Sequence, residues 1–177
     1  AEHPKRLEEI CGADGSGCRG PASEVWQRVQ DAAEQAYDRS SRCSFTSFVA
    51  YEYSPSTGVS TLHRNIIFKN EHVPFPISYF EQPTREGLWR ELDAACRNAG
   101  TGCDVLAIPH NPNESNGKMF RVEYPGATTV DEQRAQAELR ARMEPLLEVF
   151  QHKGDSECRN GLSGIVGEPD EQCDFEK

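Results

Sequence analysis

At 177 residues the chain is long enough for one folded domain with a hydrophobic core, although only 36% of it is hydrophobic. Its formal net charge of -10, from 29 acidic and 19 basic residues, would repel a phosphate backbone, so we expect no nucleic-acid partner. The longest apolar runs, such as VLAI at 105–108, are far shorter than the roughly 20 residues that cross a bilayer. We therefore expect a soluble protein without a membrane span.

The first part of the chain predicts one helix followed by two strands. Residues 1–20 are expected to be irregular, and a helix is predicted over 21–38, where apolar residues recur at spacings of three and four. Residues 44–53 and 61–69 are predicted to be strands, because they are rich in apolar and β-branched residues and flank the turn-forming SPSTGVS.

Capping residues mark two further helices. Thr84 is predicted to cap a helix that ends at Gly100. Another helix is predicted from Thr129, with Glu132 in the capping-box position, to about Met143, because the following proline cannot continue it.

The remaining segments are two short strands and two irregular regions. DVLAIP at 104–109 has the pattern of a short buried strand, and LLEVFQ at 146–151 predicts another. The loop 110–118 and the segment 158–177 are too polar and turn-rich for regular structure. The alternation of helix and strand predicts one α/β domain over 1–177 with a largely parallel sheet, apart from an antiparallel pair or long connection at 44–69.

Seven cysteines carry information about the cellular compartment. Three pairs each enclose a glycine-containing loop that would let the two sulfur atoms meet, namely Cys11 with Cys18, Cys96 with Cys103, and Cys158 with Cys173. Three disulfides favour a periplasmic or secreted protein, whereas the alternative is seven reduced cysteines. The remaining Cys43 precedes a strand-like segment, and we expect it to be small apolar filling rather than a nucleophile.

A carboxylate and three histidines fall at or near the ends of predicted strands. Glu52 ends the first strand, His110 follows DVLAIP, His152 follows LLEVFQ, and a hairpin would return His63 beside Glu52. Glutamate with neutral imidazoles suits zinc, manganese or iron. Such a cation would lower the pKa of a bound water and neutralise charge on a phosphoryl or acyl oxygen. Alternatively, Glu52 is an exposed strand carboxylate and His63 a hydrogen-bonded strand histidine.

Two polar segments are further candidates for a binding site. The loop 110–118 carries side chains able to hold a polar ligand or to orient a ligating imidazole, although turn chemistry also explains its asparagines. The segment around KGDSE has a cation suited to phosphate, although charged turns are normally only solvated. The residues concerned are Asn111, Asn113 and Asn116 in the first segment and His152, Lys153 and Glu157 in the second.

Four segments carry a resemblance to a known family: FVAYEYS, LHRNIIF, VLAIPHNPNESNGKMF and LLEVFQHKGDSEC. Over roughly residues 18–160 the chain resembles the middle portion of an uncharacterised bacterial family known only as a domain of unknown function. That family is similar in turn to the polymerase and histidinol phosphatase (PHP) superfamily of metal-dependent phosphoesterases. The likeness implies a distorted (β/α) barrel holding two or three metal ions, with Glu52, His63 and His110 as ligands.

The chain lacks two motifs of that superfamily, histidine-x-histidine and aspartate-x-histidine. It is thus either a fragment of a longer metal-dependent hydrolase, which we favour, or a version that has lost its chemistry. A fragment would be a partial barrel, inactive alone, whose exposed strand edges favour a homo-oligomer. Its substrate would be a small molecule, a phosphoester by resemblance only. The alternative is a non-catalytic secreted binding or structural domain that uses the loop 110–118.

Overall fold

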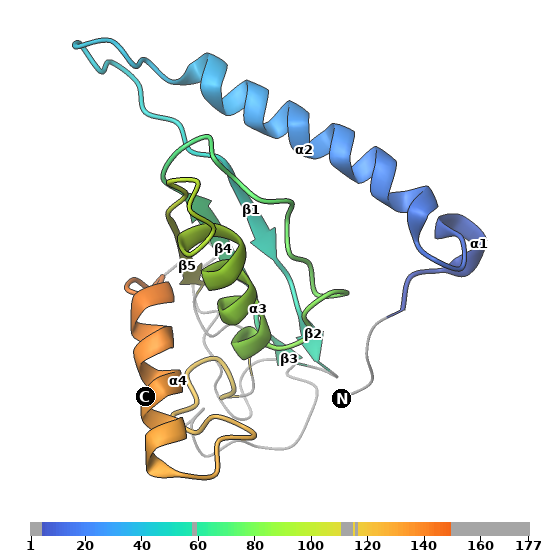
Figure 1. Ribbon diagram of the computed structural model, residues 1–177, viewed down its shortest axis with the longest axis vertical. Coiled ribbons are helices and arrows are strands. Elements are labelled where there is room, and N and C mark those ends of the chain that lie inside the picture. The colour runs from blue at the N-terminus through green and yellow to red at the C-terminus, as the bar shows by residue number, and fades with distance from the viewer. Residues whose placement is uncertain (1–4, 58–59, 111–114, 116, 150–177) are drawn as a thin grey trace, which may run out of the picture. The chain divides into compact units, whose positions relative to one another are not determined.

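The computed structural model describes residues 5–57, 60–110, 115 and 117–149 (Figure 1). The elements in chain order are α1 (Glu8–Cys11), α2 (Ser16–Ala36), β1 (Ala50–Tyr53), β2 (Ser56–Thr57), β3 (Ser60–Thr61), β4 (Arg64–Phe68), α3 (Arg85–Leu92), the π-helical turn η1 (Asp93–Arg97), β5 (Val105–Pro109) and α4 (Val130–Met143). Within these described residues, no helix is both long and apolar enough to cross a membrane.

The chain divides into two compact units. The site unit, as we call it, contains Glu52–Asn65 and the chain from Leu106 onward. The helix unit contains the chain up to Tyr51 and Ile66–Val105. The expectation of a single domain over 1–177 stays a prediction.

The main sheet has three strands in the order β1-β4-β5, and it is antiparallel and open. Backbone hydrogen bonds at the strand ends agree with the antiparallel direction. Phe68 N donates to Val49 O and Lys69 N donates to Asp104 O, each at 3.0 Å, so the end of β4 lies beside the starts of β1 and β5. The predicted α/β class is confirmed as a mixed α/β fold, but the largely parallel sheet was wrong. The alternation of helices and strands in the sequence gives the order of the elements. It does not give the direction of each strand relative to its neighbour in the sheet.

The strand predictions differ in outcome. Strands are present within 44–53, 61–69 and 104–109, although the first two are shorter than predicted. Residues 146–149 form no strand, so the prediction at LLEVFQ was wrong for them, and 150–151 lie outside the described residues. Leu146, Leu147 and Val149 are exposed there instead, at 56%, 51% and 76%.

The first long helix begins earlier than its sequence suggested. The helix predicted over 21–38 is α2, which starts at Ser16, passes through Pro21 and ends at Ala36. Asp14 Oδ1 accepts a hydrogen bond from Ser16 N over 3.0 Å and so occupies one of the free amides at the helix start. The irregular segment predicted over 1–20 was therefore wrong for 8–11 and 16–20.

Two of the three expected disulfides are present. Cys11 is bonded to Cys18, and Cys96 to Cys103. The pair Cys158 and Cys173 lies outside the described residues. Cys43 is a free and exposed thiol, so its expected role as buried apolar filling was wrong.

The predicted N-terminal caps of the two later helices are confirmed, whereas the predicted end at Gly100 was wrong, because α3 ends at Leu92 and η1 at Arg97. Thr84 Oγ1 accepts a hydrogen bond from Gly87 N over 3.1 Å at the start of α3. At the start of α4, Thr129 Oγ1 accepts from Glu132 N over 3.2 Å, while Glu132 Oε2 accepts from Thr129 N over 2.9 Å. This reciprocal pair is the capping box that the sequence predicted.

Aromatic rings join α2 to two strands within the helix unit. The Trp26 ring lies edge-on to Tyr51 and Phe68, with centroids 5.8 and 6.3 Å away. Its Nε1 donates to Pro74 O over 3.0 Å, which satisfies the one polar atom of the buried indole. Trp26 therefore attaches α2 to the sheet. Val25 and Val29 of the same helix are more exposed than Trp26.

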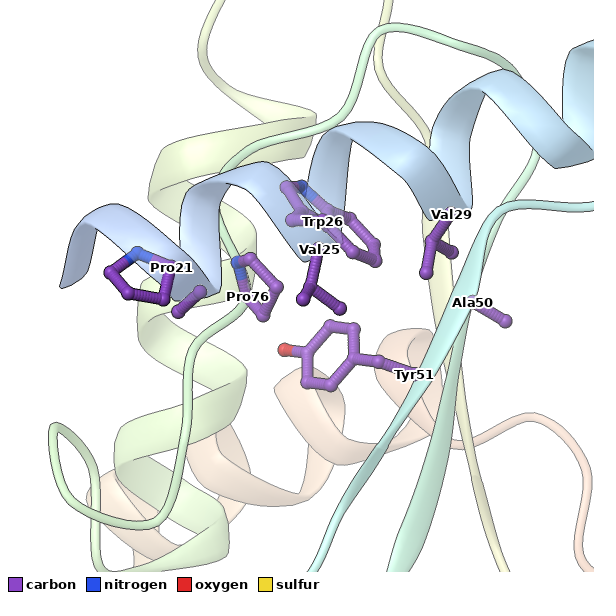
Figure 2. A pocket seen from close by; sticks show the side chains of 8 residues that line it. Pro21, Val25, Trp26, Val29, Ala50, Tyr51 and Pro76 are labelled. Atoms are coloured by element: carbon purple, nitrogen blue, oxygen red, sulfur yellow. The ribbon is translucent and has the colours of Figure 1, made fainter. Parts of the chain in front are cut away.

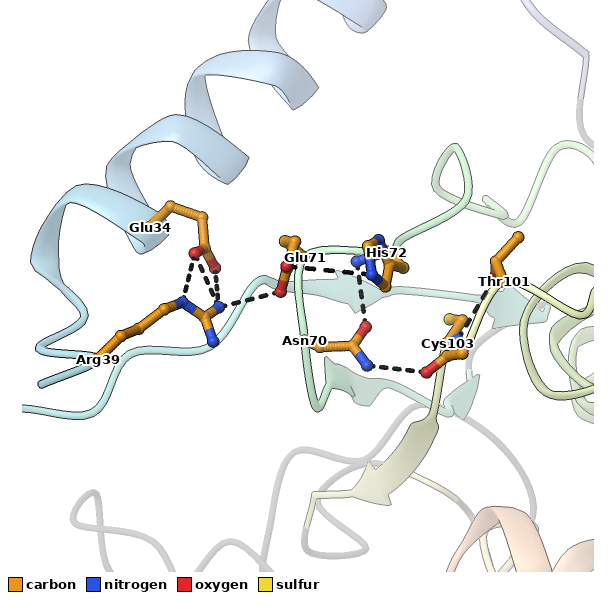
Figure 3. A network of polar contacts seen from close by, with 8 residues as sticks. Glu34, Arg39, Asn70, Glu71, His72, Thr101 and Cys103 are labelled. Atoms are coloured by element: carbon orange, nitrogen blue, oxygen red, sulfur yellow. Dashed lines mark hydrogen bonds and ion pairs between the residues drawn. The ribbon is translucent and has the colours of Figure 1, made fainter. Parts of the chain in front are cut away.

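A polar network at the other end of α2 holds the turns of the helix unit (Figure 3). Arg39 donates to both carboxylate oxygens of Glu34 and, over 3.1 Å, to Glu71. Asn70 Nδ2 donates to Gly102 O over 2.8 Å, next to the disulfide at Cys103. The network thus joins the end of α2 to the turn after β4, and that turn to the loop before β5.

A buried ion pair lies inside the site unit. Arg64 Nε donates to Glu144 Oε1, and the two side chains are only 0% and 2% exposed. Arg140 also lies 3.4 Å from Glu144. Because each buried charge requires its partner, this pair fixes the end of α4 beside β4.

Replacing Arg64 with Met is expected to lower the free energy of unfolding by about 3–5 kcal/mol, because it leaves the Glu144 carboxylate buried without its main partner. Urea denaturation followed by circular dichroism measures this effect. Arg134→Met is the matched control, since its pair with Asp131 is 63% and 88% exposed, and it should cost about 0.5 kcal/mol or less. An equal loss in both variants would contradict the role given to the buried pair.

Candidate functional site

A hairpin brings the first two candidate residues together in the site unit. Glu52 lies in β1, after which the chain reverses through β2 and β3, which pair Ser56 with Thr61 and Thr57 with Ser60. Leu62 N then donates to Pro55 O over 3.1 Å. His63 follows directly, one residue before β4 begins.

Glu52, His63 and His110 form one cluster. Each offers a ligand atom, and these three atoms lie within 4.8 Å of one another. His63 Nδ1 lies 2.8 Å from Glu52 Oε1. The rings of His63 and His110, which follows β5, meet edge to face with centroids 5.2 Å apart. The three residues that the sequence singled out as a ligand set are thus neighbours in space.

The cluster is open to solvent on its carboxylate side. The Glu52 side chain is 49% exposed and that of His63 only 24%. Ser54 Oγ donates to Glu52 Oε1 over 2.8 Å, the same oxygen that faces His63. Two hydrogen-bond donors therefore hold this oxygen in place. Sequence reasoning missed Ser54, which directly follows β1 and lies two residues after Glu52.

The pKa of His63 is below its ordinary value. Partial burial of the ring is the largest cause, because it disfavours the imidazolium. Glu52 opposes this shift, whereas the nearby His110 and Arg64 add to it. His63 is therefore neutral at pH 7, with Nδ1–H directed at Glu52 and a lone pair left on Nε2.

A carboxylate and two imidazoles of this kind suit a divalent transition metal. Zinc is commonly held by three protein ligands with a fourth position left open, at bond lengths of about 2.0–2.2 Å. The 4.8 Å spread of the ligand atoms is wider than such a shell, so the side chains would have to move closer together to hold a cation. His63 would then ligate either through Nε2, with Glu52 orienting the ring at Nδ1, or through Nδ1, with Glu52 as a further ligand.

The other candidate residues fall outside the described part of the chain. These are Asn111, Asn113 and Asn116 of the polar loop and His152, Lys153 and Glu157 of the later segment. Their suggested roles stay predictions. Of the loop 110–118, the structure describes His110, Ser115, Gly117 and Lys118. Lys118 Nζ donates to Ser60 Oγ over 2.8 Å, which attaches the end of this loop to β3.

Comparison with protein families gives one match, over residues 2–177, to a family described as "Protein of unknown function (DUF3604)". The chain belongs to this family. The predicted resemblance to a domain of unknown function is thereby confirmed, while the match shows no link to the PHP superfamily. Searches of curated proteins and of solved structures found nothing that matches the chain.

In metal-free protein, the His63 ring is expected to titrate below the ordinary histidine pKa of about 6.5. Replacing Glu52 with Gln should lower the midpoint further, because it removes a negative charge that favours the imidazolium. Proton NMR of the His63 ring during a pH titration with chelator present measures both values. The exposed His72 serves as the internal reference. A higher midpoint in the Glu52→Gln variant would refute this account of the site.

Proposed function

We propose that Glu52, His63 and His110 bind a divalent transition metal and that this site belongs to a metal-dependent hydrolase acting on a small molecule, with phosphoesters as the substrate class. The observation that carries the proposal is the approach of one carboxylate and two imidazoles to within 4.8 Å from three separate strands or strand ends. One carboxylate and two imidazoles are a ligand set that catalytic zinc sites use.

The electrostatics of the cluster support metal binding. A histidine ligates through a neutral nitrogen, and burial keeps His63 neutral to a lower pH than an ordinary histidine. The nearby carboxylate compensates for the charge of a cation. A hydrogen bond from His63 Nδ1 to Glu52 would leave Nε2 as the ligand and fix the orientation of the ring.

The exposed side of the cluster is where a substrate would enter. With Glu52 half exposed and His63 mostly covered, a ligand would approach from the side of the carboxylate. When bound, the cation would supply Lewis-acid activation of water and offset negative charge on a phosphoryl or acyl oxygen. Ser54 and His63 restrain Glu52, and this reduces the motion that a bound cation must suppress.

The substrate class and the fold around the site rest on the resemblance to the PHP superfamily. This chain has three of the ligands that the superfamily pattern implies and lacks histidine-x-histidine and aspartate-x-histidine. We therefore propose that the chain alone binds metal weakly and turns over little, and that a longer hydrolase with a PHP-type barrel would supply the remaining ligands. The two disulfides are consistent with an extracytoplasmic location and favour a periplasmic or secreted enzyme.

Isothermal titration of metal-free protein with Zn²⁺ or Mn²⁺ at pH 7.5 tests the site. Glu52→Ala, His63→Ala and His110→Ala are each expected to weaken binding at least tenfold, because three ligands leave no redundancy. For the wild type, affinity should be steady above pH 6.5 and fall below the lowered pKa of His63, where protons compete with the metal.

Glu71 and His72 provide matched controls, since they form another glutamate–histidine neighbour pair outside the cluster, 4.0 Å apart. Their alanine variants should bind metal like the wild type. If Glu52→Gln retains most of the affinity that Glu52→Ala loses, Glu52 orients His63 and is not a direct ligand. Absence of binding for both metals would reject the hydrolase proposal and favour a non-catalytic binding domain that uses the loop 110–118.

A further inference from the structure

A shallow apolar groove runs between α2 and β1 within the helix unit (Figure 2). Its volume is about 430 Å³. The residues that line it are Pro21, Ala22, Val25, Trp26, Val29, Ala50, Tyr51 and Pro76. Figure 2 shows Val25 and Tyr51 facing one another in its middle, with Pro21 and Pro76 toward one end and Val29 and Ala50 toward the other. We call this feature the α2 groove.

The α2 groove offers no polar group to a ligand. Trp26 Nε1 already donates to Pro74 O over 3.0 Å. The Tyr51 hydroxyl donates to Ile77 O over 3.2 Å and accepts from Ile77 N over 3.1 Å. An occupant must therefore bring apolar side chains and find its polar partners at the rim.

The helix wall of the groove is an apolar stripe that stays exposed. Trp26 is 7% exposed because it packs toward the sheet, whereas Val25 and Val29 are 57% and 37% exposed. Pro21, Val25 and Val29 recur four residues apart and so form one row along α2. Exposed apolar rows on a charged helix are typical of surfaces that bind another protein.

The edge of α2 beside this row is charged, and it carries Glu24 and Arg28, followed by Asp31 further along the helix. Glu24 and Arg28 are one helical turn apart, beside Val25, and both are exposed. Within the part of the chain that the structure describes, neither takes part in an ion pair. Two charges of opposite sign, four residues apart on one edge, are self-complementary when two such helices lie antiparallel.

We propose that the α2 groove is a homodimer interface, in which α2 of a second copy lies antiparallel across it. A two-fold axis near Trp26 would set Arg28 of each copy opposite Glu24 of the other, so that both ion pairs form at once. Val25 of each copy would lie near the axis, and Val29 would meet the turn at Pro21 and Ala22 of the other copy. The sequence predicted a homo-oligomer through exposed strand edges, whereas this interface lies on α2. Dimer formation through α2 does not depend on the metal site.

Sedimentation equilibrium of the whole chain, with Cys43 replaced by Ser in every sample to prevent intermolecular disulfides, tests the dimer. The parent protein is expected to be a dimer, and Val25→Glu a monomer with an unchanged circular dichroism spectrum. Val122→Glu is the matched control, since Val122 is 83% exposed and lies outside the helix unit, and it should remain dimeric. If Val25→Glu misfolds, Val29→Lys takes its place.

Charge exchange tests the antiparallel arrangement. Arg28→Glu and Glu24→Arg should each weaken the dimer about tenfold, because each places like charges opposite one another. The double variant, which exchanges the two charges, should recover most of the parent affinity. A parent protein that is monomeric at every concentration, a dimer that survives Val25→Glu, or a double variant weaker than both single variants would overturn the proposal.

Discussion

The hairpin formed by β2 and β3 is the constraint on which the candidate site depends. It reverses the chain within a few residues and returns His63 to hydrogen-bonding distance of Glu52. The antiparallel sheet order β1-β4-β5 then determines which strand end lies near them, because β5 pairs with β4 and His110 directly follows its last residue, Pro109. In a parallel sheet, the same three residues would have reached a common edge only through long crossovers.

Burial and exposure have separate roles in this cluster. The His63 ring is partly covered, which lowers its pKa, while the Glu52 side chain remains half exposed. Next to them in sequence, Arg64 is fully buried and its charge is balanced by Glu144. Two successive residues thus have different roles: His63 offers a neutral imidazole as a candidate metal ligand, and Arg64 forms a structural ion pair. Their side chains point to opposite sides because neighbouring residues in an extended chain alternate in direction.

Local chemistry in the sequence predicted local structure well. The N-terminal caps at Thr84 and Thr129 and the disulfides Cys11–Cys18 and Cys96–Cys103 each depend on atoms a few residues apart, and these four features are present. The grouping of Glu52 with His63 was also predictable, because a turn-forming stretch lies between them. Their closeness to His110 followed from a rule for parallel sheets that does not apply here, so that part of the inference reached the observed cluster by the wrong route.

Features set by distant contacts were not predictable. Strand direction depends on how α3 and its flanking loops return the chain, and no local pattern encodes it. The hydrogen bond from Ser16 N to Asp14 Oδ1 and the Cys11–Cys18 bond both lie at the early start of α2, whereas Pro21 alone suggests a later first turn. LLEVFQ has the composition of a strand, yet residues 146–149 form none, and Glu148 N donates to Pro109 O at the end of β5.

The division of the chain into two units falls inside all three strands of the main sheet. It passes between residues 51 and 52 in β1, 65 and 66 in β4, and 105 and 106 in β5. Tyr51, which supports the α2 groove, and Glu52, which contributes to the candidate site, are therefore covalent neighbours. No single cut, by a protease or by a gene truncation, can release one unit intact. The residues of the candidate site and those of the α2 groove therefore alternate along one continuous chain.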